Sequence, residues 1–325
     1  MSTLKSVLGH SCFYTNAIKD FETIISEEKT VFVSRNQKLE LSINGDKGKD
    51  DKLEIFRSLL DLLFLYIGAF PQIESLDYND EKIDVSTWSV KFQTRNDLNR
   101  SDLLICQLDK DTINQGRIDE MKWIPFFPLH SMQFLISKAY SHVVSDHKIT
   151  LLLHVIEGLV DKSDNQQIKE EIKQVYNVSA GNTIGSYMAD VYFVLKNYFY
   201  KYENDFNCEL LSVLSTDEYK FLQTISDTRN WYSHFLQDKE KKNRLKTGRE
   251  MQIYFEIIYY VLRVYCVDRI GISIEEERVK EHFYSVYDWI CEITNENVEN
   301  PKSKIYRINR EWNEFMRLVN SYQEK

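Results

Sequence analysis

The stretch Met251–Val267, MQIYFEIIYYVLRVYCV, decides the fold of this chain. It is apolar enough to be compared with a membrane span, which needs about twenty apolar residues. Glu256 and Arg263 interrupt it at spacings that leave one apolar stripe, the pattern of a helix that packs within a protein. The segment Leu53–Phe70, LEIFRSLLDLLFLYIGAF, has the same character and also contains two charged residues. We therefore expect two buried core helices and no membrane partner.

Helical spacing of apolar residues continues on both sides of Met251–Val267, from Pro128 almost to the end of the chain. A final amphipathic helix is expected at Lys304–Tyr322. This pattern predicts an all-α domain over residues 128–292 and a C-terminal helix within residues 293–325. The expected helices of the all-α domain are Ser131–Val144, Lys148–Val160, Asn165–Tyr176, Ser186–Tyr202, Thr216–Leu236, Thr247–Arg269 and Ile274–Ile290.

The first 127 residues mix strand and helix signals. Thr30–Ile43 (TVFVSRNQKLELSI) turns into an alternation of apolar and polar residues, which predicts a strand pair or one long strand. Lys82–Thr94 and Leu103–Leu108 are further candidate strands, and Asn44–Lys52 (NGDKGKDDK) is typical of an exposed loop. The predicted fold class is α+β, with a small mixed domain at residues 1–127 that serves as a sensor or regulator of the helical bundle.

Composition restricts the function classes. The chain has 325 residues and a formal net charge of -9, so any contact with nucleic acid must be local. Its five cysteines are scattered singly, which predicts neither a zinc site nor a disulfide framework and favours the reducing cytoplasm. No cofactor or metal is expected. The spacing of the histidines gives no ligand pair on one helical turn and favours scattered surface or core residues at His130, His142, His147 and His154.

Residues 215–234 contain the side chains that could form a catalytic site. Ser215–Glu218 has the form of a capping box and predicts the start of a helix. The apolar stripe that follows contains Arg229 in its gap, which places a cation on the buried face. Burial of an unpaired guanidinium is prohibitive, so Arg229 should meet an acid, line a cleft or face a symmetry partner. Asn230 and His234 are four residues apart and lie together on the flank of this stripe.

The hexapeptide Arg229–His234, RNWYSH, resembles the catalytic motif of the HEPN superfamily of helical ribonucleases. The run SDTRNWYSHF, a basic linker and a long apolar helix are together similar to the HEPN domain of ApeA-like bacterial proteins. The helix LLLHVIEGLV, with Glu157, resembles the early helix of that domain, which contains an acid. The resemblance implies a homodimer with a composite cleft. It also implies a role in anti-phage defence, where RNA cleavage by a toxin or abortive-infection effector halts the infected cell.

The chemistry of these side chains agrees with the resemblance. The 2′-hydroxyl of RNA can attack the neighbouring phosphate and leave a 2′,3′-cyclic phosphate if protons are moved and charge is stabilised, and no metal is required. We expect His234 to act as acid or base, Arg229 to bind the phosphate and Asn230 to support both. Glu157 and Asp227 are candidate supporting residues, and Glu157 is expected to pair with Arg229 or with another base.

A basic segment follows the motif. Lys239–Arg249 (KEKKNRLKTGR) contains one acid, Glu240, and could hold the backbone of an RNA such as tRNA or mRNA. It could equally be a solvated linker between helices. Two other functions stay open, a catalytically inactive HEPN-type module that binds RNA or protein and a toxin controlled by modification of its own residues. The candidate RNA-binding residues are Lys239, Lys241, Lys242, Arg244, Lys246 and Arg249.

Overall fold

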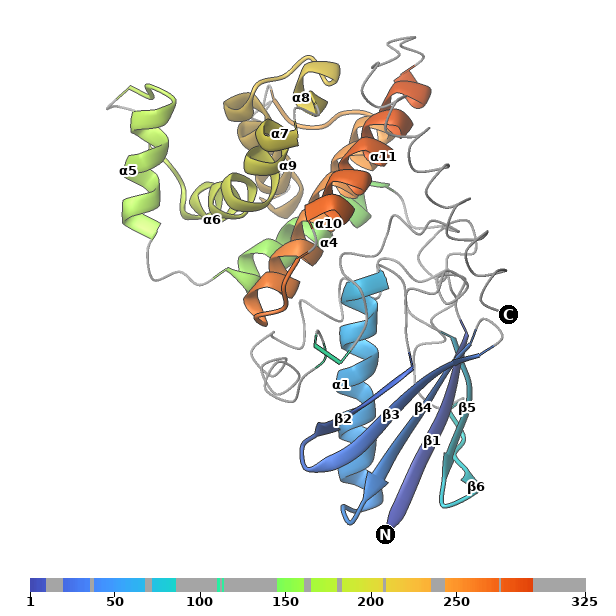
Figure 1. The fold of residues 1–325 in the computed structure, drawn as a ribbon. Coiled ribbons are helices and arrows are strands. Elements are labelled where there is room, and N and C mark those ends of the chain that lie inside the picture. Colours follow the sequence, from blue (N-terminus) through green and yellow to red (C-terminus); the bar gives the residue numbers. More distant parts are fainter. Residues whose placement is uncertain are drawn as a thin grey trace.

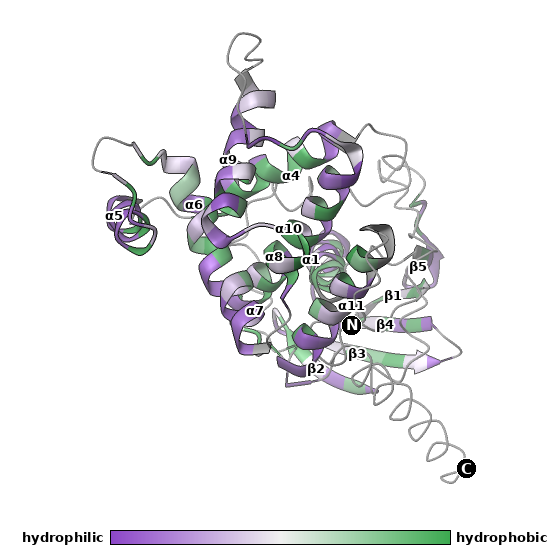
Figure 2. Cartoon of the chain, turned by 90° about the horizontal axis from the view of Figure 1, so that it is seen from above, coloured by the Kyte–Doolittle hydropathy of each residue, from purple (hydrophilic) through white to green (hydrophobic). Residues whose placement is uncertain are grey.

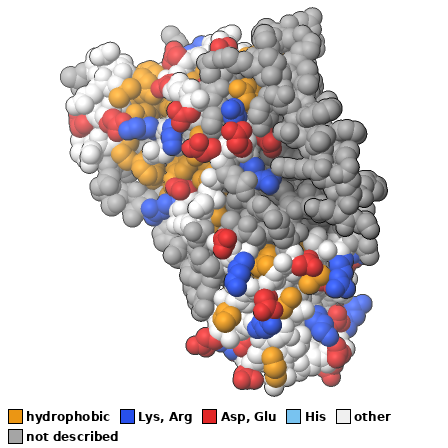
Figure 3. Space-filling view, viewed as in Figure 1, with side chains coloured by type: hydrophobic (Ala, Val, Ile, Leu, Met, Phe, Trp, Pro, Cys, Tyr) orange, Lys and Arg blue, Asp and Glu red, His pale blue; other side chains and the backbone are white. Residues whose placement is uncertain are grey.

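The computed structural model consists of a sheet half and a helical half (Figure 1). Acidic and basic side chains are interspersed over the visible face of the sheet half (Figure 3). No helix within the described residues is both long and apolar enough to cross a membrane. The structure describes residues 1–9, 20–35, 38–67, 72–85, 110–111, 113, 145–160, 165–179, 183–206, 209–234, 243–274 and 276–294.

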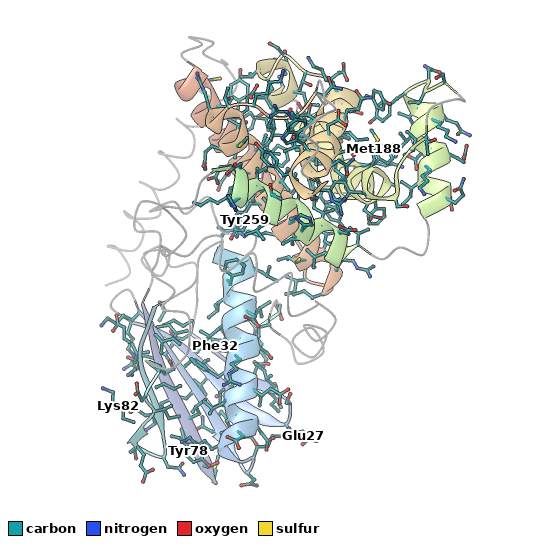
Figure 4. All side chains as sticks on the ribbon, turned by 180° about the vertical axis from the view of Figure 1, so that it is seen from behind. Glu27, Phe32, Tyr78, Lys82, Met188 and Tyr259 are labelled. Atoms are coloured by element: carbon teal, nitrogen blue, oxygen red, sulfur yellow. The ribbon has the colours of Figure 1, made fainter. Side chains whose placement is uncertain are left out.

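The sheet half contains an antiparallel sheet with the strand order β2-β3-β4-β1-β5-β6. Helix α1 (Lys49–Ile67) runs along one face of this sheet, as Figure 4 shows. The helix buries its apolar stripe, including Phe56, Leu59 and Leu63, in a core shared with the sheet. The strands are β1 (Ser2–Gly9), β2 (Phe21–Ile25), β3 (Glu28–Arg35), β4 (Lys38–Gly45), β5 (Gln72–Tyr78) and β6 (Glu81–Lys82).

The strand pair predicted at Thr30–Ile43 is confirmed as the antiparallel pair β3 and β4, in which Phe32 lies opposite Leu41. Alternate residues of β4 face the core, as the apolar and polar alternation predicted. Strand β1 was not predicted, because Ser6 stands where its alternation calls for an apolar residue. Ser6 is nevertheless buried, and its hydroxyl donates to the carbonyl of Ser75 in β5.

One expectation for the sheet half was wrong, and another is only partly covered by the described residues. The loop expected at Asn44–Lys52 is shorter, since β4 continues to Gly45 and α1 already begins at Lys49. Asp50 and Asp51 lie in the first turn, where the helix dipole favours acids. The strand expected at Lys82–Thr94 is described only to residue 85, and residues 83–85 are not strand. Its remainder and Leu103–Leu108 lie outside the described residues.

Most of the predicted helices in the helical half are confirmed. Helix α10 lies at the centre of this half and contacts α1, α4, α6 and α11. Figure 2 shows green, hydrophobic residues where the helices meet around α4 and α10, and a largely purple, hydrophilic α5 at the edge. The expected helices 131–144 and 304–322 lie outside the described residues, as does the expected boundary after residue 127. The helices are α4 (Ser145–Leu159), α5 (Asn165–Val175), α6 (Ser186–Leu195), the π-turn η6 (Lys196–Tyr200), α7 (Lys201–Phe206), α8 (Leu210–Val213), α9 (Glu218–His234), α10 (Gly248–Arg269) and α11 (Glu276–Thr294).

Helix ends show which capping signals the chain uses. The capping box expected at Ser215–Glu218 was wrong, because Ser215 has a φ of 51° and lies before the helix. Asp217 caps α9 instead, and its Oδ1 accepts from the backbone N–H of Lys220 at 2.8 Å. A true capping box starts α10, where the backbone N–H of Glu250 donates to the Thr247 hydroxyl at 3.2 Å. Helix α11 continues to Thr294, past the boundary expected at residue 292.

The two halves meet where the end of α1 packs against α10. The ring of Phe64 in α1 makes an edge contact with the ring of Tyr259 in α10, at a centroid distance of 6.4 Å. Figure 4 shows Tyr259 next to the upper end of α1. Helix α10 also packs against α4, the helix that contains Glu157, so α10 contacts both α1 and a helix of the candidate site.

Candidate active site

Helices α4 and α9 run side by side, and Arg229 of α9 bonds to Glu157 of α4. The guanidinium Nη2 donates to Glu157 Oε2 at 2.6 Å. The Arg229 side chain is 15% exposed and that of Glu157 is 35% exposed. Arg229 thus lies mostly buried on the core side of α9 and meets an acid, one of the three outcomes expected for a cation in this stripe. Because the pair stays open to water, the structure avoids the full desolvation penalty of two buried charges.

Tyr187 of α6 supports the guanidinium from a third helix. The centre of the guanidinium lies 5.0 Å from the centroid of the Tyr187 ring, within the range of a cation–π contact. The Tyr187 hydroxyl donates to the carbonyl of Leu153 at 3.0 Å, which fixes the ring under Arg229. Burial raises the pKa of Tyr187 well above its ordinary value, so this hydroxyl keeps its proton. The sequence analysis missed Tyr187, because nothing in the order of residues places α6 beside α9.

The other predicted residues of α9 lie before and after Arg229 in the sequence. Asn230 is half-buried, and its Oδ1 accepts from Nη1 of Arg229 at 3.3 Å. Asp227 is half-buried two residues before Arg229. His234 is the last residue of α9, and only its position in the helix is described. The structure therefore brings Arg229, Asn230 and Glu157 together and places His234 at the end of the same helix.

A second contact joins α4 and α9 beside the ion pair. The Nε2 of His154 lies 3.0 Å from the hydroxyl oxygen of Ser233, a residue inside the motif. The Nδ1 of the same imidazole lies 2.8 Å from the carbonyl oxygen of Thr150. His154 is an exposed histidine, as the sequence analysis allowed, but its contact with the motif helix was not predicted. Its spacing of three residues from Glu157 was the signal that could have found it.

Comparison with known families assigns this part of the chain. Residues 152–277 match the family described as Apea-like HEPN. The match includes Glu157 and the whole segment Arg229–His234. This region is an Apea-like HEPN domain. HEPN domains are associated with RNA and with ribonuclease activity, often in defence. No curated protein sequence and no solved structure matches the chain.

Leu245, in the basic segment after the motif, lies against the body of the HEPN domain. The backbone N–H of Leu245 donates to the buried hydroxyl of Thr228 at 2.9 Å, which holds this segment against α9. Arg244 stacks over the ring of Trp231 at 4.1 Å from its centroid. Lys246 and Arg249 are exposed. The described part of the basic segment therefore offers two exposed cations, and Lys239, Lys241 and Lys242 lie outside the described residues.

Within the described ranges, no three side chains of His, Cys, Asp or Glu come together as a metal site would require. The described side chains of the site can bind an anion through Arg229 and transfer a proton through the imidazole of His154 in α4.

Proposed function

We propose that the HEPN domain is a metal-independent endoribonuclease, which cleaves RNA by attack of the 2′-hydroxyl and leaves a 2′,3′-cyclic phosphate. The observation that carries the proposal is the Arg229–Glu157 ion pair, in which the guanidinium also makes a cation–π contact with the ring of Tyr187. It holds a guanidinium in a fixed orientation at a partly exposed position. His234 follows Arg229 by little more than one helical turn, so a phosphate and an imidazole can meet there.

Each residue has a role in this mechanism. Arg229 binds the phosphate and stabilises the extra charge on its oxygens during attack, as a planar donor group does best. Glu157 is a positioning residue that holds the guanidinium through Nη2. His234 transfers a proton, because histidine is the side chain that ordinarily changes charge near neutral pH. Asn230, bonded to Arg229, supports both groups, and Asp227 adds negative charge before the motif.

The assembly that we propose is a homodimer in which two motif helices form one cleft. Leu151 of α4, three residues before His154, is a large apolar side chain with 37% of its surface exposed. A single exposed apolar side chain is ordinary on a protein surface, so the support for the dimer is that HEPN domains often dimerise. The proposed setting is the bacterial cytoplasm, where RNA cleavage serves anti-phage defence and the sheet half senses the trigger or restrains the nuclease.

The test incubates total RNA with the full-length protein in the presence of a chelator. The wild type is expected to produce fragments that end in a cyclic phosphate, whereas His234→Ala and Arg229→Ala are expected to lose this product. Lys220→Ala is the matched control, since it removes an exposed cation from the same helix. Cleavage that survives His234→Ala, or that needs a divalent ion, would contradict the mechanism.

A second candidate is an inactive module that binds RNA or protein. The specific observation in its favour is that Glu157 already neutralises the guanidinium. This candidate predicts RNA binding by the wild type without any cyclic-phosphate product. Gel-shift and cleavage assays on the same preparation separate the two candidates.

A further inference from the structure

We infer that His154 is a second proton-transfer residue of the proposed reaction and acts as the general base that deprotonates the 2′-hydroxyl. The inference rests on the proposed function and deepens it, because the motif supplies only one histidine in each subunit, His234. Cleavage by 2′-hydroxyl attack moves two protons, one from the attacking oxygen and one to the leaving oxygen. Two imidazoles can divide this work, and α4 provides the second one.

The bonds of His154 define which nitrogen carries its proton. A carbonyl oxygen can only accept a hydrogen bond, so the Nδ1 that lies 2.8 Å from the carbonyl of Thr150 must be the protonated nitrogen. In the neutral imidazole the Nε2 is then a bare acceptor. It receives the hydroxyl of Ser233 at 3.0 Å. The Thr150 carbonyl thus orients the ring and leaves a basic nitrogen directed at a hydroxyl group.

Nε2 of His154 lies where a base for the 2′-hydroxyl is needed. Two contacts join the helices: Glu157 pairs with Arg229, and His154 pairs with Ser233. Because the earlier residue of α4 contacts the later residue of α9, the two helices are antiparallel. Residues three or four apart on a helix are surface neighbours. His154 therefore lies one turn from the group that holds the phosphate-binding Arg229. His154 is exposed, so a substrate can reach it.

The Ser233 hydroxyl marks where a substrate hydroxyl would bind. When RNA binds, its 2′-hydroxyl replaces Ser233 at Nε2 of His154. That nitrogen takes the proton while the 2′-oxygen forms its bond to phosphorus. The bond from phosphorus to the 5′-oxygen breaks, and this oxygen takes a proton from the imidazolium of His234. One proton is accepted and one is donated, so the products are the cyclic phosphate and a free 5′-hydroxyl.

The first arm of the test measures pH profiles of cleavage. The probes are sixteen chimeric oligonucleotides, each with a single ribonucleotide in one of the dinucleotide contexts. His154→Ala and His154→Gln are expected to lower kcat/KM by about 100-fold or more, the usual contribution of a general base. Both variants should also lose the acidic limb of the profile, which reports the base of the free enzyme. His147→Ala is the matched control on α4, where it removes another exposed imidazole.

The second arm replaces the leaving 5′-oxygen of each probe by sulfur, which departs without a general acid. His234→Ala should regain cleavage on this substrate and His154→Ala should not. Rescue of His154→Ala, or activity of both His154 variants within threefold of wild type, overturns the inference but leaves the proposed function intact. A wild type that cleaves no probe overturns both.

Ser233→Ala completes the design. If its hydroxyl only occupies the base before RNA binds, its removal is expected to lower KM about threefold, the effect of one competing hydrogen bond. Loss of all cleavage in Ser233→Ala would instead indicate that Ser233 itself attacks the substrate, and it would overturn the inference.

Discussion

Arg263 in the middle of α10 donates two hydrogen bonds to the carbonyl oxygen of Leu65 in α1. Its Nε lies 3.0 Å and its Nη2 lies 2.8 Å from that oxygen, and the side chain is fully buried. Leu65 belongs to the last turn of α1, where carbonyl groups lack partners within the helix and the helix dipole favours a cation. Arg263 therefore fastens the end of the sheet half's helix to the central helix of the HEPN domain.

Replacement of Arg263 by Met should weaken this junction. The substitution keeps an apolar stem but leaves the Leu65 carbonyl without these two donors, so we expect a loss of about 2–4 kcal/mol in the free energy of unfolding. Urea denaturation measures it. Arg249→Met is the control, because Arg249 is exposed in the first turn of the same helix and should change stability by less than about 0.5 kcal/mol. Equal effects of the two substitutions would show that the junction adds little stability.

The Arg229–Glu157 pair should show measurable coupling in a double-mutant cycle. Glu157→Gln leaves a mostly buried guanidinium without its carboxylate, and Arg229→Met leaves a carboxylate that water can still reach. We expect the first substitution to be the more destabilising, with a coupling free energy of about 1–2 kcal/mol from thermal unfolding of the four proteins. A coupling below about 0.3 kcal/mol would mean that the two side chains do not hold one another in solution.

The sheet half contains an ion pair that is buried away from water. The ammonium group of Lys52 in α1 contacts the carboxylate of Glu28 in β3, and both side chains are buried. Lys52→Met should destabilise the protein by about 3–5 kcal/mol, because it leaves a buried carboxylate unpaired. The double variant Glu28→Gln with Lys52→Met should recover most of this loss, since Gln can still accept from the backbone N–H of Lys47. Chemical denaturation measures the free energy of unfolding of the wild type, Lys52→Met and the double variant. A double variant no more stable than Lys52→Met would refute the argument.

Glu203 should make the stability of the HEPN domain depend on pH. Burial raises the pKa of this carboxyl from 4.5 to about 7, although its bond from the backbone N–H of Leu211 lowers it. The folded protein therefore binds the proton more tightly than the unfolded chain. The contribution of Glu203 to the free energy of unfolding is fully present below pH 4.5 and is lost as the pH rises through about 7.

The variant Glu203→Gln tests this dependence by thermal unfolding. It keeps an acceptor for Leu211 and removes the charge, so at pH 8 it should be more stable than the wild type by up to about 3 kcal/mol. At pH 4 the two proteins should be similar. Glu209→Gln, an exposed neighbour, should give no such difference. A gain that is the same at both pH values would reject the role of Glu203.

The two exposed cations after the motif should contribute to RNA affinity through salt-dependent contacts. Lys246→Gln and Arg249→Gln are each expected to reduce the slope of log K against log salt by up to about one, the effect of one lost phosphate contact. Lys82→Gln on the exposed strand β6 is the control for net charge. Unchanged slopes in the first two variants would support the interpretation of this segment as a solvated linker.

The sequence by itself determined the helical half and the identity of the motif helix. Apolar residues at helical spacing predicted α4, α5, α9 and α10, because a helix that packs on one face must repeat its apolar residues with the period of the helix. The same period placed Arg229 on the buried side and required a partner for it. The alternation in β3 and β4 likewise predicted their pairing, since one face of a strand must be apolar to join a core.

Only the tertiary structure decided which side chains meet. The choice of Glu157 as the partner of Arg229, the ring of Tyr187 beneath it and the contact of His154 with Ser233 all depend on the packing of three helices that are distant in sequence. Periodicity states which face of a helix is buried, but it carries no information about the helix that covers that face. The bond from Arg263 to Leu65, across 198 positions, was beyond sequence reasoning for the same reason.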